Sequence, residues 1–355
     1  INFSPACDYS NMWLMLEISR DLLLILRTFV LSFAAESLKN LWHILVPTYK
    51  DLSNDVILIT GAGAGIGRLM CLEFAQYCPT LIGLDMNKDT LNETARAVVK
   101  LGGSILHTYV CDLRSRDNIN QTVARVLREV GRVTILVNNA GVVSGKRILD
   151  LKPVDIDNTF QVNVISHIYM LQALLPSMMG SDGRVNDGVG SSHSAPRGHI
   201  VTIASLASVI PNPGLADYCA SKAAALMLSD ALELELRVAN LEKHIHVTRV
   251  CPFLINTQMF EGCRSSLSWL FPVVDADYCV RQIVKAVRAN ERLVFIHRWQ
   301  FLLAVLYWIL PRNTIHRLLD LCGTSQFVPQ LQEHRKRRHE GITSVFPSCQ
   351  PPPSE

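Results

Sequence analysis

The sequence predicts an α/β fold, a single domain with a doubly wound parallel sheet over residues 51–290. Short apolar runs alternate with helix-like segments throughout this range. The first apolar run leads directly into a glycine-rich turn, and the second run ends in an acidic residue. Regular alternation of strands and helices places helices on both faces of a parallel sheet.

The glycine-rich turn predicts a site for a dinucleotide. A strand is expected over Val56–Thr60, the turn follows at Gly61–Gly67, and a helix is expected over residues 68–77. Glycines in this position let backbone N–H groups approach a pyrophosphate, whose charge the helix dipole favours. We therefore expect a Rossmann-type sheet, with phosphate contacts from Gly61, Gly65, Ile66 and Gly67.

The second apolar run bears on the choice of cofactor. It spans Thr80–Asp85, and its final carboxylate is placed to accept both ribose hydroxyls of an adenosine and to repel a 2′-phosphate. Position 64 in the glycine turn is not basic, and Met86 follows the acid. The sequence therefore favours NAD over NADP, with Lys88 and Arg68 the residues best able to reverse that preference.

Later strands add two further expectations. A third strand is predicted over residues 107–112, where Asp112 receives the adenine amino group, caps the following helix, or does both. A helix is predicted over residues 117–130, and a buried strand then runs into Asn138–Gly141. A sixth strand over residues 246–251 leads to Thr257, which either caps the next element or touches the cofactor.

A tyrosine and a lysine predict acid–base chemistry. Tyr218 and Lys222 are four residues apart in a segment with helical character, so they share one helix face. A phenol ionises near pH ~10, so it is a poor base at neutral pH unless a cation stabilises the phenolate. Lys222 is placed to supply that charge, and Ser205 to hold an alcohol or carbonyl oxygen. The same spacing also occurs by chance on solvated helices, so the surrounding motifs decide between these interpretations.

Asn163 needs an explanation because it lies inside an apolar helix predicted over residues 153–175. Asparagine is a poor helix former. Its side chain therefore either pairs with a broken backbone bond or orders a water near the site.

Composition excludes several classes of partner. The formal net charge of +3 gives no basis for nucleic-acid binding. The ten cysteines show neither a Cys-x-x-Cys pair nor a His/Cys ligand spacing, so no metal site is expected. We interpret them as reduced packing thiols in a cytosol-facing domain. The chain is 49% hydrophobic and 18% charged, with the apolar excess concentrated at both ends, which indicates membrane contact there.

The N-terminal residues 1–50 are expected to form a membrane-associating segment and linker. From residue 28 onward, polar positions recur every three or four residues, which is the pattern of an amphipathic helix in a membrane interface. The alternative is a helix packed on the core of the protein itself.

The C-terminal residues 291–330 form a second apolar segment. The uncharged run Phe301–Leu310 falls short of the ~20 residues needed to span a bilayer. Trp299, Trp308, Arg298 and Arg312 flank it, so we interpret it as an interfacial or re-entrant helix, with a buried core helix as the alternative.

Three remaining segments have simpler interpretations. Residues 180–198 are a polar loop insertion, and residues 258–274 are expected to form an apolar substrate lid. Residues 331–355 are a basic, proline-rich tail that either contacts anionic head groups or stays solvated.

Five motifs occur in order at ordinary spacings, namely Thr60–Gly67, Asn138–Gly141, Asn163, Ser205 and Tyr218-x-x-x-Lys222. With these motifs, residues 53–290 resemble the short-chain dehydrogenase/reductase family. A finer resemblance, to the membrane-associated branch containing retinol and hydroxysteroid dehydrogenases, rests on Leu84–Lys88, Ile135–Gly145, Gly198–Ser205, Asp217–Lys222 and Asn256–Arg264. Phe253 departs from the pattern, because the family usually has glycine there.

The resemblance implies a role for each candidate residue. Tyr218 is the general acid/base, and Lys222 lowers its pKa and holds the nicotinamide ribose. Ser205 orients the substrate oxygen, and Asn163 anchors a proton-relay water. Cofactor contacts are implied for Asn139, Ala140, Gly141 and Thr257, beside those of the glycine turn, Asp85, Asp112, Tyr218 and Lys222.

The expected reaction is the NAD-dependent interconversion of a lipophilic alcohol and its carbonyl. The favoured example is the oxidation of all-trans-retinol to retinal. A hydroxysteroid or other lipid alcohol is the alternative substrate, and aldehyde reduction with NADPH is disfavoured by Asp85. An inactive lipid-surface scaffold is the alternative from another class, and the intact Ser205, Tyr218 and Lys222 argue against it. The resemblance also implies a homodimer at the endoplasmic reticulum membrane or a lipid droplet.

Overall fold

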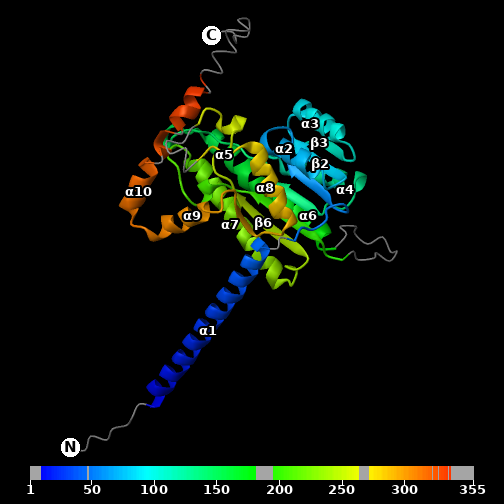
Figure 1. Cartoon of the computed structure of the whole chain (residues 1–355). Coiled ribbons are helices and arrows are strands. Elements are labelled where there is room, and N and C mark those ends of the chain that lie inside the picture. Colours follow the sequence, from blue (N-terminus) through cyan, green and yellow to red (C-terminus); the bar gives the residue numbers. More distant parts are fainter. Residues whose placement is uncertain are drawn as a thin grey trace, which may run out of the picture. The chain divides into compact units, whose positions relative to one another are not determined.

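The computed structural model describes residues 9–45, 48–180, 195–263, 272–321, 323–326, 328–334 and 336, with side chains of the first helix described for residues 16–35 (Figure 1). It divides into two units, residues 1–50 and 51–355. Most of the polar loop, residues 264–271 of the expected lid, and the tail beyond residue 336 lie outside the described residues.

The larger unit is built on one parallel sheet, as the sequence predicts. The strand order is β3-β2-β1-β4-β5-β6-β7, and every pairing is parallel. The chain runs outward from β1 to β3 and then returns to β4 on the other side of β1, which creates a crevice between β1 and β4 at their carboxyl ends. The strands are β1 (Val56–Thr60), β2 (Thr80–Asp85), β3 (Ile105–Val110), β4 (Ile135–Asn138), β5 (Gly198–Ile203), β6 (Ile245–Cys251) and β7 (Leu293–Phe295).

Helices cover both faces of this sheet (Figure 1). Because side chains alternate along a strand, Ile57 and Ile59 of β1 pack into the core beneath α2, α3 and α8. Leu58 packs into the opposite core beneath α4, α6 and α7. The helices are α2 (Gly65–Phe74), α3 (Lys88–Leu101), α4 (Arg116–Glu129), α5 (Pro153–Phe160), α6 (Ser166–Met178), α7 (Ala216–Val238) and α8 (Ala276–Arg288).

The helix predicted over residues 153–175 is interrupted. Between α5 and α6 the backbone widens into a π-helical turn, η2 (Gln161–Ile165), with Asn163 at its centre. Such π-turns are rare and occur frequently at functional sites. Helical periodicity does not reveal this interruption, because the apolar spacing continues through it.

The sheet extends beyond the expected domain boundary at residue 290. Strand β7, with only three residues, pairs with β6 and was not predicted because so short a run carries no periodic signal. It is followed by α9 (Gln300–Ile309) and α10 (Arg312–Leu321). Short 3-10 turns complete the unit: η1 (Ile148–Asp150), η3 (Leu206–Ser208), η4 (Gln258–Phe260) and η5 (Thr324–Gln326).

The smaller unit contains the single helix α1 (Tyr9–Leu45), whose described side chains over residues 16–35 are all exposed. Its hydroxyl groups bond to the helix itself: Ser19 donates to Leu16 O at 2.8 Å, and Thr28 donates to Leu24 O at 2.7 Å. Their hydrogen-bonding needs are therefore met without water. Within the described part of the chain, no helix combines the length and the apolar character required to cross a bilayer.

Candidate active site

A cleft with a volume of about 620 Å³ opens at the carboxyl ends of β1 and β4. Of the candidate residues, only Asn163 is absent from its lining and lies behind the wall of the cleft. The structure thus brings together residues that are up to about 200 positions apart in the chain. Those lining the cleft are Gly61, Gly65, Ile66, Gly67, Asp85, Asp112, Asn139, Ala140, Gly141, Ser205, Tyr218, Lys222 and Thr257.

The glycine turn has the backbone geometry expected for a phosphate site. Gly61 and Gly65 adopt positive φ angles of 68° and 53°. A Cβ atom at Gly67 would lie 2.0 Å from the Gly61 carbonyl oxygen, so only glycine allows α2 to approach the turn this closely. At Gly65 a Cβ would meet no atom within 4 Å, because this position faces open space.

Asp85 holds the turn in place and also faces the cleft. Its carboxylate accepts backbone N–H bonds from Gly63 and from Asn87, each at 2.9 Å. Each carboxylate oxygen has a further lone pair available to a ribose hydroxyl. The two backbone bonds therefore fix the carboxylate at the position where the second strand meets the glycine turn.

Asp112 does not cap the helix that follows it, which was one of its two expected roles. Ser115, not Asp112, caps α4 by accepting the Asn118 N–H. The Asp112 carboxylate instead forms an ion pair with Arg114 at 2.7 Å, and both residues line the cleft. Its hydrogen bond with Arg114 is the largest of the influences that lower the pKa of Asp112.

These residues fit a nicotinamide dinucleotide. Ala64, the residue that precedes α2, makes no side-chain cap to the first turn of the helix, so no side chain competes with a phosphate there. The open space at Gly65 adjoins this helix start, and the Asp85 carboxylate lines the same cleft, where a ribose hydroxyl could bond to it. The cleft volume is also within the ~300–1,000 Å³ typical of ligand sites.

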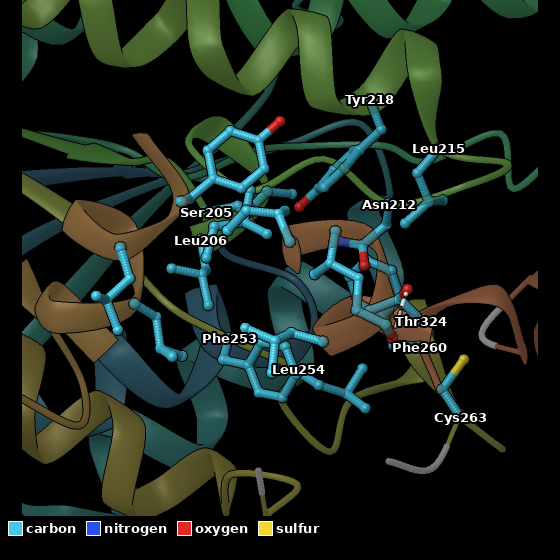
Figure 2. Close-up of a pocket in the computed structure, with 18 residues that line it drawn as sticks. Ser205, Leu206, Asn212, Leu215, Tyr218, Phe253, Leu254, Phe260, Cys263 and Thr324 are labelled. Carbon is cyan, nitrogen blue, oxygen red and sulfur yellow. Dashed lines mark hydrogen bonds between the residues drawn. The ribbon is translucent and has the colours of Figure 1, made fainter. Parts of the chain in front are cut away.

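Tyr218 lies in the first turn of α7 and is buried. Burial raises the pKa of its phenol, while a hydrogen bond with the Ser205 side chain acts in the opposite direction. Figure 2 shows the Tyr218 hydroxyl group at a cavity that Ser205 also lines. Ser205 is positioned by its own backbone, since its Oγ accepts the Ala207 N–H at 3.1 Å as the cap of η3.

Lys222 is buried one helical turn after Tyr218. Its ammonium donates to the Ile203 carbonyl oxygen at 2.8 Å and lies 5.9 Å from the centre of the Tyr218 ring. Burial lowers the pKa of Lys222 to about 8. The ammonium therefore remains mostly protonated at neutral pH. For Tyr218, burial is the largest influence on the pKa of the phenol.

Asn163 joins two parts of the site through its buried amide. Its Oδ1 accepts the Val142 N–H at 2.8 Å, and its Nδ2 donates to Val142 O at 3.0 Å and to Ser221 Oγ at 2.9 Å. The amide does pair with backbone groups, but not with a broken bond of the helix that contains it, which was one of the two expectations. The groups belong to the loop after β4 and not to its own helix.

Sequence reasoning assigned no role to Asp217, which precedes Tyr218 and is buried. Its carboxylate accepts hydrogen bonds from Ser144 at 2.9 Å and from Thr159 at 3.0 Å. These bonds connect the start of α7 to α5 and to the loop after β4. A carboxylate inside the apolar stretch around Tyr218 was the available signal, because buried carboxylates are seldom found without partners.

A second, apolar cavity of about 130 Å³ adjoins the cleft and shares Ser205, Tyr218, Phe253 and Phe260 with it (Figure 2). Phe260, from the expected lid, packs edge-on against the Tyr218 ring with centroids 5.9 Å apart. The opposite wall comes from the C-terminal helices, which were not predicted to contribute. Its residues from α9 and α10 are Leu303, Leu306, Tyr307, Ile315, Leu318 and Leu319.

Among the described residues, no group of three or more His, Cys, Asp or Glu side chains is arranged to hold a metal ion. The described cysteines are buried free thiols. Burial raises the pKa of Cys71 and Cys279 to about 12, so these thiols stay protonated at neutral pH.

Comparisons with known proteins agree with this geometry. A family model described as short chain dehydrogenase matches residues 55–267. The epidermal retinol dehydrogenase 2 of Mus musculus is 34% identical over 322 residues, which cover 91% of this chain and 98% of that protein.

Two solved structures share the fold and were determined with different cofactors. A metagenomic short-chain oxidoreductase in complex with NADP is 26% identical, with a TM-score of 0.54, and covers 69% of this chain and 96% of its own. A short-chain dehydrogenase/reductase from Burkholderia phymatum in complex with NAD is 22% identical, with a TM-score of 0.59, and covers 73% and 94%. Together they support a nicotinamide cofactor without selecting one of the two.

Proposed function

Because this chain belongs to the short-chain dehydrogenase/reductase family and is an NAD(P)-dependent alcohol oxidoreductase, we propose that it oxidises a lipophilic alcohol with NAD, with all-trans-retinol as substrate and retinal as product. The apolar cavity that ends at the Ser205 and Tyr218 hydroxyl groups is the observation that supports this proposal. A hydrocarbon chain can pack against the apolar lining, and its alcohol group can lie at the Ser205 and Tyr218 hydroxyl groups.

Ser205, Tyr218 and Lys222 each have a separate role in the proposed reaction. Ser205 donates a hydrogen bond to the substrate oxygen, and Tyr218 takes the hydroxyl proton as the carbonyl forms. Lys222 supplies a positive charge one helical turn away, which favours the phenolate form of Tyr218. When bound, the nicotinamide accepts the hydride from the alcohol carbon.

Asn163 acts through the surrounding scaffold in this proposal. Its amide fixes the loop after β4 against Ser221 of α7, one residue before Lys222. An ordered water held at this junction would pass the proton from Lys222 toward solvent.

NAD is the proposed physiological cofactor because Asp85 presents a carboxylate where the ribose hydroxyls bind. A 2′-phosphate would stand beside that negative charge, and Met86 offers no compensating cation. Arg114 lines the same cleft and could in principle pair with a 2′-phosphate, but it is already paired with Asp112.

The proposed location is a membrane interface at the endoplasmic reticulum or a lipid droplet. The outward face of α9 is apolar, with Trp308 68% exposed and Ile309 71% exposed. Arg312 lies over the rings of Tyr307 and Trp308, a combination suited to lipid head groups. Since the inward faces line the apolar cavity, a substrate dissolved in lipid would meet its site directly.

We also propose that the chain forms a homodimer through α7. Met227, Leu234 and Val238 are apolar and exposed on this helix, and a second copy would cover them. Sedimentation of detergent-solubilised protein tests this, and a monomeric species at micromolar concentration would contradict it.

The function is tested with membranes that carry the full chain. We expect NADH formation with all-trans-retinol, and the Tyr218→Phe variant should lower turnover by about 10²–10⁴-fold while retaining NADH binding. Turnover equal to wild type in this variant would exclude the proposed mechanism. Activity with hydroxysteroids alone would retain the mechanism and change the substrate, whereas NADH binding without any alcohol turnover would favour the scaffold.

A further inference from the structure

The apolar cavity contains a polar side chain with no catalytic role. Asn212 lines it, and Figure 2 shows the Asn212 amide directed into the space that the Tyr218 hydroxyl also borders. Most other lining residues are aliphatic or aromatic, and the Thr324 hydroxyl already donates to Leu319 O at 3.1 Å. Asn212 therefore stands out as a polar group presented to whatever fills the cavity.

The backbone around Asn212 is held firmly. Residues 212–215 form a turn in which the Leu215 N–H donates to Asn212 O at 3.2 Å. Pro213 restricts the turn, and Gly214 has a φ of +74°. A Cβ at Gly214 would lie 2.7 Å from a Val328 side-chain atom, so the turn is packed against the C-terminal segment. The amide is thus presented from a rigid support.

The turn itself does not account for the amide. An asparagine in the first position of a turn often accepts a backbone N–H two residues later. In the part of the chain that the structure describes, the Asn212 side chain has no hydrogen bond of this or any other kind. Its two donors and its carbonyl oxygen are available to a ligand.

A ligand made only of hydrocarbon at this position would bury the amide without a partner. Such burial is unfavourable, whereas a ligand oxygen at hydrogen-bonding distance would satisfy the amide. Sites built to bond a ligand oxygen discriminate strongly against analogues that lack it.

We propose that Asn212 is a specificity-determining residue that binds a second oxygen on the substrate, distant from the alcohol that reacts at Tyr218. This inference rests on the proposed function and refines it: the preferred substrate is a bifunctional lipid alcohol. An oxygenated retinoid and a hydroxysteroid with a second oxygen share this chemistry, whereas retinol itself lacks it.

Two matched pairs of alcohols test the proposal on the full-length protein in membranes. The retinoid pair is all-trans-retinol and all-trans-4-oxoretinol, and the steroid pair is 5α-androstan-3α-ol and androsterone, which adds a 17-ketone. Within at least one pair, wild type should favour the oxygenated member by about tenfold in kcat/KM, mainly through KM, as expected for one hydrogen bond.

In Asn212→Leu, which preserves the size of the side chain, that preference should fall to about twofold or less. Leu303→Met is the matched control, because it changes another wall of the same cavity without altering polarity and should keep the preference. A ratio near one for both pairs in wild type, or an unchanged ratio in Asn212→Leu, would overturn the inference.

Equilibrium binding separates this inference from the proposed function. Quenching of protein fluorescence by each of the four alcohols reports affinity whether or not turnover occurs. Absence of turnover with all four would remove the proposed function, while a lost affinity difference in Asn212→Leu would still support the subsite. Normal turnover with equal affinities within each pair would remove the subsite alone.

Discussion

The ammonium of Lys222 lies 5.9 Å from the centre of the Tyr218 ring, one helical turn away and equally buried from solvent. The hydrogen bond of this ammonium goes to the Ile203 carbonyl oxygen, so a buried positive charge lies beside the phenol without bonding to it. Keeping a charged lysine buried has a cost in stability, and that cost can be measured.

Replacing Lys222 by methionine should stabilise the fold at neutral pH while abolishing activity. The pKa of Lys222 is about 8 when folded and 10.5 ordinarily, so the unfolded chain binds this proton more tightly. The resulting destabilisation is on the order of 3 kcal/mol below pH 8 and disappears as the pH rises toward 10.5.

Chemical denaturation of wild type and Lys222→Met at pH 7 and pH 10 measures this effect. The difference between the two proteins should shrink at the higher pH, because only wild type is relieved of the buried charge. A difference independent of pH would show that folding does not lower the pKa of Lys222.

Two glycines of the same turn should respond differently to alanine. Gly67→Ala places a Cβ 2.0 Å from the Gly61 carbonyl oxygen, so the turn must move and the protein should lose both cofactor binding and stability. Gly65→Ala meets no neighbour, and its positive φ costs only about 1–2 kcal/mol.

Thermal unfolding and NADH fluorescence titration distinguish these variants. Gly65→Ala should remain folded and bind NADH more weakly, because its methyl group enters the space expected for the pyrophosphate. NADH affinity equal to wild type in Gly65→Ala would place the phosphates elsewhere.

The charge of Asp85 should determine the choice between the two cofactors. Wild type should bind NADH at least about tenfold more tightly than NADPH, and Asp85→Asn should reduce that ratio because the amide removes the charge but still accepts a backbone hydrogen bond. Isothermal titration with both cofactors measures the ratio. Equal affinities in wild type would contradict the assignment of NAD.

Removal of residues 1–46 should release a large fraction of the protein from membranes, because α1 exposes an apolar surface over residues 16–35. Combining this deletion with Trp308→Ser and Ile309→Ser should release the remainder, since both side chains are exposed and their loss should not unfold the domain. Flotation of the variants with liposomes measures attachment. Full retention of the combined variant would locate the membrane contact on another surface.

The amino-acid sequence by itself determined the fold class, the glycine turn, the Asp85 carboxylate and the Tyr218–Lys222 pair. Each of these depends on local spacing: alternating periodicities define the strands and helices, and a four-residue interval defines a shared helix face. The Rossmann-type sheet then brings the ends of β1, β4 and β5 together by topology alone, which is why the predicted cofactor residues line one cleft.

Only the tertiary structure decided the rest. Helices α9 and α10 form a wall of the apolar cavity, and Asn212 directs its amide into that cavity, although both lie outside any local motif. The π-turn at Asn163 and the bonds of Asp217 likewise depend on partners that lie up to 73 residues away. Local propensity cannot specify such contacts, because they arise from how separate elements pack against one another after the sheet has formed.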